Sequence, residues 1–209
     1  MATDHEYAVI GHSRAQVGRY LGTIAGALAA AAAVLAAAAF RWFAQIGLED
    51  HVPQLVLWPV TAGAVFGIVH WIFNRVVWRW SIVRRLLRIP DLNGCWVVTG
   101  TTMNAQPGNP TRWGGELTIR QSWEKIWVHL KTPTSVSRSK AAALLHEPGA
   151  GYCLMYAYRN EPGIGQSLSP HVGYAELVFN EALNGADGEY FNSNGRVTYG
   201  RMSLIRKVR

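Results

Sequence analysis

Two apolar segments in the first ninety residues, followed by a long stretch with a strand-like period, limit what this chain can fold into. The first segment, residues 21–40, holds twenty residues without a charged side chain. As a helix with a rise of about 1.5 Å per residue it is ~30 Å long, which matches the hydrocarbon core of a bilayer. The second segment, residues 55–73, is interrupted only by Thr61 and His70. The sequence therefore predicts a membrane anchor of two helices.

Arginines flank the two segments unequally. The connecting residues 41–54 carry one arginine and two acids, whereas several arginines follow the second segment: Arg75, Arg79, Arg84, Arg85 and Arg88. Because basic residues are enriched on the cytoplasmic side of membranes, this asymmetry predicts cytoplasmic termini and a cytoplasmic C-terminal domain. The first segment is too long for the apolar core of a cleaved signal peptide, and a second segment follows it, so it is predicted to stay in the membrane.

After Pro90 the apolar pattern changes to a period of two residues, which is typical of strands. Eight strand-like runs are predicted, at residues 94–102, 116–123, 125–132, 135–145, 152–160, 172–180, 188–192 and 197–207. Turn-forming pairs such as Pro148-Gly149 separate many of these runs. Short, evenly spaced runs predict an antiparallel meander, and a meander of this size tends to close into a barrel, which removes exposed edges. A β-sandwich is the alternative.

The predicted fold class is a membrane-anchored all-β protein. It consists of two N-terminal transmembrane helices followed by a small eight-stranded antiparallel up-and-down β-barrel. The last 119 residues are enough for a domain with its own core. The predicted parts are a short cytoplasmic N-terminus at residues 1–19, a two-helix transmembrane anchor at 20–80, a basic stalk at 81–90 and a cytoplasmic, ligand-sensing barrel at 91–209.

Side-chain alternation indicates what the barrel would contain. Two runs each place polar or aromatic side chains on one face: Ser135, Ser137 and Ser139 in the first, and Tyr156, Tyr158 and Asn160 in the second. If these faces point inward with that of Trp123, the interior has an apolar floor and a polar mouth. Because buried polar groups need partners, this interior suits one small, flat, polar ligand. The alternative places the serines in solvent and the tyrosines at the rim.

The sequence contains no motif for catalysis or metal binding. There is no His-Glu-x-x-His, Gly-x-Ser-x-Gly, phosphate loop or dinucleotide fingerprint. Cys95 and Cys153 lie far apart, without a cysteine neighbour at metal spacing. We therefore expect neither an enzyme nor a bound metal or cofactor. Much of the net charge of +7 belongs to the membrane flanks, so no binding to a DNA or RNA polymer is predicted.

Layout and motifs together resemble a known family. The likeness is carried by two membrane helices and then RIPDLNGCWVVTGT, WGGELTIRQSWEKIWVHLKTPTSVSRSKAAAL, LMYAYRNEP, HVGYAELVF and DGEYFNSNGRVTYGRMSL. In this order they resemble the two-transmembrane β-barrel effectors of bacterial CBASS anti-phage systems, the CD-NTase-associated β-barrel proteins. The resemblance covers most of the chain from about residue 21 onward.

The resemblance implies a cytoplasmic barrel, held at the bacterial inner membrane by two spans, that binds a cyclic dinucleotide made by a partner CD-NTase. Binding would promote homo-oligomerisation of the helices in the lipid bilayer, membrane disruption and death of the infected cell by abortive infection. Two alternatives remain. A membrane-tethered, lipocalin-like carrier of a hydrophobic ligand would have an aliphatic interior. A ligand-free membrane adaptor would have a packed interior and its serines in solvent.

Ten residues are predicted to contact the ligand, in three groups. The first group would stack on the bases: Trp123, Trp127, Tyr156 and Tyr158. The second would neutralise the phosphates: Arg138 and Arg159. The third would form hydrogen bonds: Ser135, Ser137, Ser139 and Asn160. Trp127 and both arginines lie off the inward register, so we expect them at the rim or on a neighbouring protomer.

Overall fold

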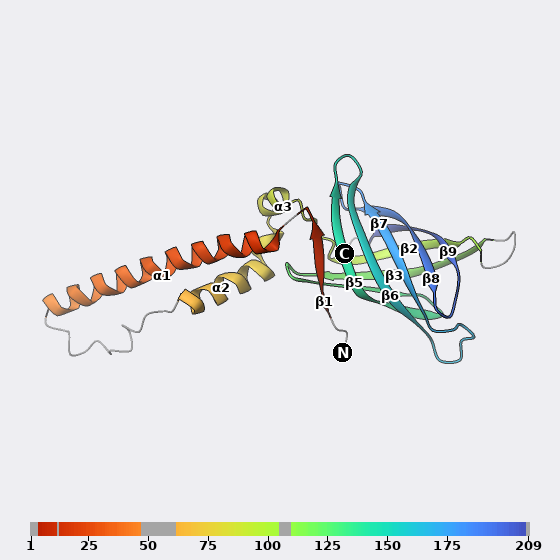
Figure 1. Cartoon of the computed structure of the whole chain (residues 1–209), viewed down its shortest axis with the longest axis horizontal. Helices are drawn as coiled ribbons and strands as arrows, with labels where there is room; N and C mark the ends of the chain where they lie inside the picture. The colour runs from red at the N-terminus through yellow and green to blue at the C-terminus, as the bar shows by residue number, and fades with distance from the viewer. Residues whose placement is uncertain (1–3, 12, 47–61, 105–109, 208–209) are drawn as a thin grey trace. The chain divides into compact units, whose positions relative to one another are not determined.

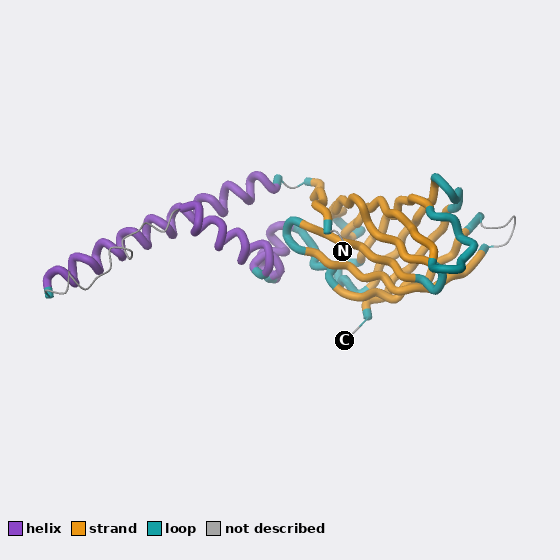
Figure 2. Tube along the Cα trace, turned by 90° about the horizontal axis from the view of Figure 1, so that it is seen from below, coloured by secondary structure: helices purple, strands orange, loops and turns teal. Residues whose placement is uncertain are grey.

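The computed structural model describes residues 4–11, 13–46, 62–104 and 110–207, and the chain divides into two compact units (Figure 1). One unit, Ser13–Trp78, contains the long helices. The other unit combines Met1–His12 with Arg79–Arg209 and contains the strands. The tube view in Figure 2 shows this division between helix and strand along the chain. The barrel unit therefore includes residues from before and after the helical unit.

Helix α1 (Arg14–Gln45) and helix α2 (Ala62–Arg75) pack side by side in the helical unit. The hydroxyl of Ser13 caps α1 by accepting from the Gln16 N–H at 3.3 Å, which satisfies one of the free donors of the first turn. Among the described residues, α1 is the one helix long and apolar enough to cross a membrane. The first predicted span lies within α1. The second predicted span lies outside the described residues up to Thr61, and the rest of it is in α2.

Short helices connect α2 to the barrel. They are the 3₁₀ helix η3 (Val77–Arg79) and helix α3 (Ser81–Leu87). Arg88 ends α3 with a left-handed backbone at φ 51°, and its N–H donates to the Arg84 carbonyl. The predicted basic stalk, residues 81–90, is therefore largely helical, and its helix ends before Pro90.

Eight strands form an up-and-down meander that closes where the last strand pairs with the first. They are β2 (Gly94–Thr102), β3 (Thr111–Gln121), β4 (Lys125–Lys131), β5 (Ser135–Glu147), β6 (Gly151–Pro162), β7 (His171–Phe179), β8 (Gly185–Ser193) and β9 (Tyr199–Arg206). Each overlaps one of the predicted runs. The predicted class, a membrane-anchored all-β protein, is confirmed.

A ninth strand, β1 (His5–Ile10), completes the ring and was not expected from the sequence. It runs parallel to β5, with Tyr7 opposite Ala142, and meets β4 at its beginning. β4 and β5 pair directly only near the turn that joins them. Tyr7 is the one buried side chain of β1, so the alternation in this short segment is too weak to predict a strand. The ring therefore has nine strands in the described part of the chain, one more than the sequence predicted.

Apolar side chains fill the half of the barrel nearest α3. Trp96 and Phe179 meet edge to face there, with ring centroids 5.0 Å apart, and both are fully buried. Other large, fully buried side chains on the strands are Leu117, Ile119, Ile126, Leu144, Leu154, Leu177 and Leu204, and Ile89 and Leu92 are buried just before β2. This cluster is the core that holds the strands in register, because a slip by one residue would turn it to solvent.

Removing one ring from this core tests its contribution to stability. We expect Phe179→Ala to lower the free energy of unfolding by about 3–5 kcal/mol, because it leaves a cavity against Trp96. Phe191→Ala is the matched control, since Phe191 is 53% exposed, and we expect a loss of less than about 1 kcal/mol. Urea unfolding of the full chain in detergent, followed by tryptophan fluorescence, measures both. Equal losses would contradict this assignment of the core.

Candidate ligand-binding site

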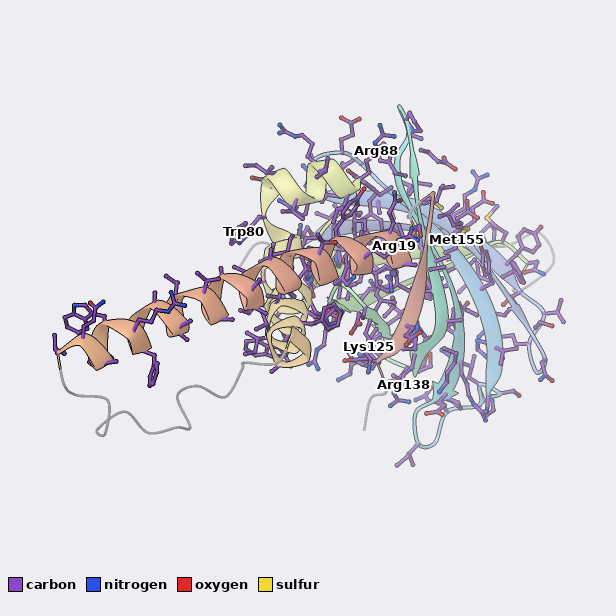
Figure 3. The ribbon with its side chains drawn as sticks, turned by 60° about the vertical axis from the view of Figure 1, so that its left-hand side comes forward. Arg19, Trp80, Arg88, Lys125, Arg138 and Met155 are labelled. Carbon is purple, nitrogen blue, oxygen red and sulfur yellow. The ribbon has the colours of Figure 1, made fainter. Side chains whose placement is uncertain are left out.

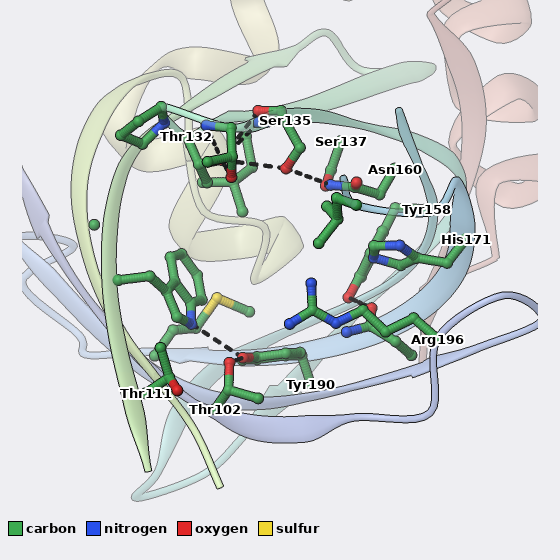
Figure 4. A pocket seen from close by; sticks show the side chains of 18 of the residues that line it. Thr102, Thr111, Thr132, Ser135, Ser137, Tyr158, Asn160, His171, Tyr190 and Arg196 are labelled. Carbon is green, nitrogen blue, oxygen red and sulfur yellow. Dashed lines mark hydrogen bonds between the residues drawn. The ribbon is translucent and has the colours of Figure 1, made fainter. Parts of the chain in front are cut away.

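A cavity of about 450 Å³ occupies the other half of the barrel interior. The ends of β2, β6 and β8 and the beginnings of β3, β5 and β7 surround it, as Figure 4 shows from close by. The rim includes the turn between β4 and β5 together with Leu168 and Arg196, which lie in the loops before β7 and β9. Because the strands are paired around the whole ring, the cavity has rigid walls.

One wall of the cavity is a polar cluster on β5 and β6. Asn160 donates from Nδ2 to the hydroxyls of Ser135 at 3.0 Å and Ser137 at 2.8 Å. These contacts follow from the register, which places Ser137 directly opposite Asn160. The Oδ1 atom of Asn160 is buried and has no hydrogen-bond partner among the described residues. A buried acceptor without a donor costs stability, so this atom is suited to accept from a ligand.

Tyrosine rings form the next part of the wall. The Tyr158 hydroxyl donates to Asn192 Oδ1 at 2.8 Å, and Asn192 Nδ2 donates to Thr198 at 2.8 Å. The Tyr158 ring lies over Gly173, where a Cβ atom would come within 2.5 Å of the ring, so the glycine makes room for it. Burial raises the pKa of Tyr156 and of Tyr158 well above the usual range. Both hydroxyls therefore remain neutral donors.

The opposite wall places an indole against a third tyrosine. Trp113 Nε1 donates to the Tyr190 hydroxyl at 3.0 Å, and their ring centroids are 5.7 Å apart. The Tyr190 hydroxyl also bonds to Thr102 Oγ1 at 2.7 Å. Gly100 gives the indole its space, because a Cβ atom there would lie 2.2 Å from the Trp113 ring. Flat aromatic surfaces therefore line both sides of the cavity.

The charge around the cavity is positive. Arg112 and Arg196 are both among the lining residues, and none of the described lining residues has a carboxylate. Figure 4 shows the Arg196 side chain pointing into the cavity. In the part of the chain that the structure describes, Arg196 forms no ion pair or hydrogen bond. An uncompensated guanidinium in a half-enclosed space favours an anionic ligand.

His171 lies beside Arg196 at the mouth. Its Nδ1 bonds to the Ser169 carbonyl at 2.8 Å, and because a carbonyl can only accept, Nδ1 carries the proton. Burial lowers the pKa of His171, and the charge of Arg196 lowers it further, while the bond to Ser169 partly opposes this shift. At neutral pH the ring is therefore neutral, and Nε2 is an acceptor.

The structure brings five of the ten predicted residues to the cavity: Ser135, Ser137, Tyr156, Tyr158 and Asn160. Ser139 is buried inside the barrel but is not one of the lining residues. Its hydroxyl accepts from the Val128 N–H at 2.9 Å and bonds to His5 Nε2 at 2.7 Å. Ser139 therefore joins strands where β1 separates β4 from β5, which is a structural role.

The other four predicted residues lie away from the cavity. Trp123 is buried in the turn between β3 and β4, at the opposite end of the barrel. Trp127 is on the outer face, where it stacks on His129 at 4.7 Å. Arg138 and Arg159 also lie outside and pair with Glu161 at 2.6 and 3.9 Å, and Figure 3 shows Arg138 on the surface of the barrel. Alternation along β4, β5 and β6 turns these side chains outward.

Several cavity residues were not predicted. Tyr190 and Asn192 share a face of β8, so their alternation could have indicated them. Arg196 lies in the loop between β8 and β9, and His171 is the first residue of β7. Neither position has a periodic signal in the sequence. The guanidinium that points into the cavity, that of Arg196, therefore belongs to a residue that the sequence pattern could not place.

Fold and cavity define a class of protein: a β-barrel receptor for a small ligand, joined to an apolar helical unit. Comparison with known families agrees. Residues 87–206 match the family described as Cap15, cyclic dinucleotide receptor domain, and residues 15–79 match Cap15, TM helices. CD-NTase-associated protein 15 from Yersinia aleksiciae is 40% identical over 205 residues, which cover 97% of each chain. The chain belongs to the Cap15 family, and the family prediction is confirmed.

Proposed function

We propose that this chain is a CBASS anti-phage effector whose cytoplasmic barrel binds a cyclic dinucleotide made by a partner CD-NTase. The observation that carries the proposal is the cavity into which Arg196 points, since none of its described lining residues has a carboxylate. A cyclic dinucleotide presents two phosphates, two flat bases and several donors and acceptors. A positive, aromatic and hydroxyl-lined cavity offers a partner for each of these groups.

The lining residues suggest a role for each part of the site. Arg196 would bind a phosphate, with His171 beside it. The rings of Tyr156, Tyr158 and Trp113 would contact the bases, since every base has a π face. The free Oδ1 of Asn160 would accept from a base or ribose donor, with Ser135 and Ser137 holding the amide in place. The role is binding, and no catalytic step is proposed.

The helical unit would convert binding into membrane damage. In this proposal residues 20–80 anchor the chain by two spans in the bacterial inner membrane, residues 81–90 form a basic stalk, and residues 91–209 sense the ligand in the cytoplasm. Gly22 and Gly26 on α1 have open space where a side chain would be, which allows another helix to approach closely. Binding would promote homo-oligomerisation, bilayer disruption and death of the infected cell.

Two other functions receive less support. A carrier of hydrophobic ligands needs an aliphatic cavity, whereas this one has hydroxyls, amides and guanidinium groups. A ligand-free adaptor needs a filled interior, whereas half of this barrel is open. Both observations favour a polar, anionic ligand.

The role of Arg196 can be tested by substitution. We expect Arg196→Gln to weaken binding of the cognate cyclic dinucleotide about tenfold or more, because a charge-assisted bond to phosphate is lost. Arg159→Gln is the matched control on the outer face, where the side chain is 58% exposed, and its affinity should equal that of the wild type. Calorimetric titration of the full chain in detergent measures both. Weaker binding by Arg159→Gln alone would reverse the assignment.

The affinity should also depend on pH. A phosphate near His171 favours the imidazolium form, so the ligand raises the pKa of His171 from its lowered value in the free protein. Binding should therefore tighten as the pH falls from about 7.5 toward 5.5. His171→Gln should remove this dependence. His129→Gln should retain it, because His129 also has a lowered pKa but lies on the outer face, beside Arg138.

Membrane disruption needs its own experiment. The full chain, reconstituted in liposomes that contain a dye, should release the dye when the cognate cyclic dinucleotide is added. The ligand concentration for half-maximal release should increase for Arg196→Gln in proportion to its loss of affinity. If the ligand binds and the dye is retained, the receptor part of the proposal stands and the membrane-disruption part is wrong.

A further inference from the structure

The end of the barrel opposite the cavity holds a buried polar cluster around Gln121, the last residue of β3. We call it the Gln121 hub, and its members are Tyr7, Arg79, Leu92, Asn93 and Gln121. The Gln121 side chain uses both of its polar atoms. Oε1 accepts from the Leu92 N–H at 2.9 Å, and Nε2 donates to the Tyr7 hydroxyl at 3.1 Å. Gln121 is only 3% exposed, so these bonds form away from water.

The main chain of Gln121 takes part as well. Its N–H donates to Asn93 Oδ1 at 2.7 Å. Its carbonyl accepts from Asn93 Nδ2 at 2.9 Å and from Arg79 Nη2 at 3.1 Å. The Tyr7 hydroxyl, which accepts from Gln121, donates to the Ser122 carbonyl at 3.2 Å. One residue of β3 thus holds β1, the segment before β2 and the residue that ends η3.

These partners lie on the two stretches of chain that lead to the helical unit. Tyr7 belongs to β1, which precedes α1 by only a few residues. Arg79 and Leu92 lie in the segment that leads from α2 to β2. Both covalent connections between the two units are therefore tied to the barrel at Gln121. This attachment follows from the order of the elements along the chain and from the hydrogen bonds of Tyr7, Arg79 and Leu92 with Gln121.

β3 joins the hub to the cavity. Its first residues, including Arg112 and Trp113, line the cavity, and its last residue is Gln121. It is paired with β2 over residues 111–119 and with β4 over residues 116–121, which include Gln121. A paired strand is stiff. A ligand that displaced the first residues of β3 at the cavity would therefore also displace Gln121 at its other end.

A glutamine at this position is not what packing alone would select. Leu117 and Ile119 precede it on the same inward face of β3. An apolar residue would continue this pattern without the cost of burying an amide. An amide whose oxygen and nitrogen are both hydrogen-bonded instead fixes the positions of its partners, because each bond has a defined direction.

We propose that Gln121 is the positioning residue that couples ligand binding in the cavity to the helical unit, by holding both of the chain's connections to that unit. The inference rests on the proposed function, since it assigns the route by which a bound ligand would act on the membrane helices. In this proposal the helical unit has a resting and an activated arrangement. A ligand shifts the equilibrium between them only if it binds the two arrangements with different affinity. Removing the hub should therefore separate binding from membrane disruption.

The test compares two readouts on the full chain in liposomes: the dissociation constant of the cognate cyclic dinucleotide, and its concentration for half-maximal dye release. For Gln121→Met we expect a dissociation constant that is unchanged or lower, because the ligand no longer has to move the helices. We expect the concentration for dye release to rise by at least about tenfold. Gln166→Met is the matched control, since Gln166 is exposed in the loop between β6 and β7, and both values should equal those of the wild type.

A milder variant distinguishes a loss of coupling from a folding defect. Tyr7→Phe removes only the hydroxyl that links β1 to Gln121, and we expect it to change the two readouts in the same directions by a smaller factor. Tyr152→Phe is its control, because Tyr152 packs on His146 at the beginning of β6 and lies outside the hub. Thermal unfolding of each variant establishes that it is folded.

The outcomes separate the two proposals. If wild-type binding and release are normal and Gln121→Met and Tyr7→Phe leave both readouts unchanged, the coupling role is wrong. If the variants weaken binding and release in parallel, Gln121 has only a structural role and the inference is also overturned. If the wild type binds no cyclic dinucleotide, the proposed function fails, and the coupling inference fails with it.

Discussion

Closure of the strand ring is the constraint on which the rest of the structure depends. β9 pairs with β2, and β1 fills the place where β4 and β5 separate. Because side chains alternate along every strand, a closed ring sends half of them into one shared interior. Without β1, residues 142–145 of β5 would be paired only with β6, so an N-terminal segment of six residues closes the barrel.

One half of the barrel interior is an apolar core, and the other half is a polar cavity. Trp96, Phe179 and their neighbours fill one half and hold the register, as in any small hydrophobic core. The other half contains hydroxyls and amides that bond mainly to one another, and such groups add little to stability compared with apolar packing. Among the described residues, Asn160 Oδ1 has no donor and Arg196 has no counter-charge, which indicates that this half is built for a ligand that would supply both.

The strands of the meander could be predicted from the sequence because their signal is local. The run predicted at residues 94–102 coincides with β2. Side-chain alternation along β5 and β6 correctly predicted that Ser137, Tyr158 and Asn160 face the barrel interior. Ser139 shares that face, but its bonds to Val128 and His5 depend on β1, a contact between distant parts of the sequence. Arg196 lies in a loop, where no period exists, so only the folded chain brings its charge to the cavity.

Titration of the full chain in detergent measures directly whether the cavity binds a cyclic dinucleotide. Calorimetry with a panel of cyclic dinucleotides that differ in their bases, the matching linear dinucleotides and one fatty acid compares the competing ligands. We expect single-site binding of one cyclic dinucleotide, tighter than that of its linear counterpart. Binding of the fatty acid alone, or of no compound by a folded chain, would contradict it.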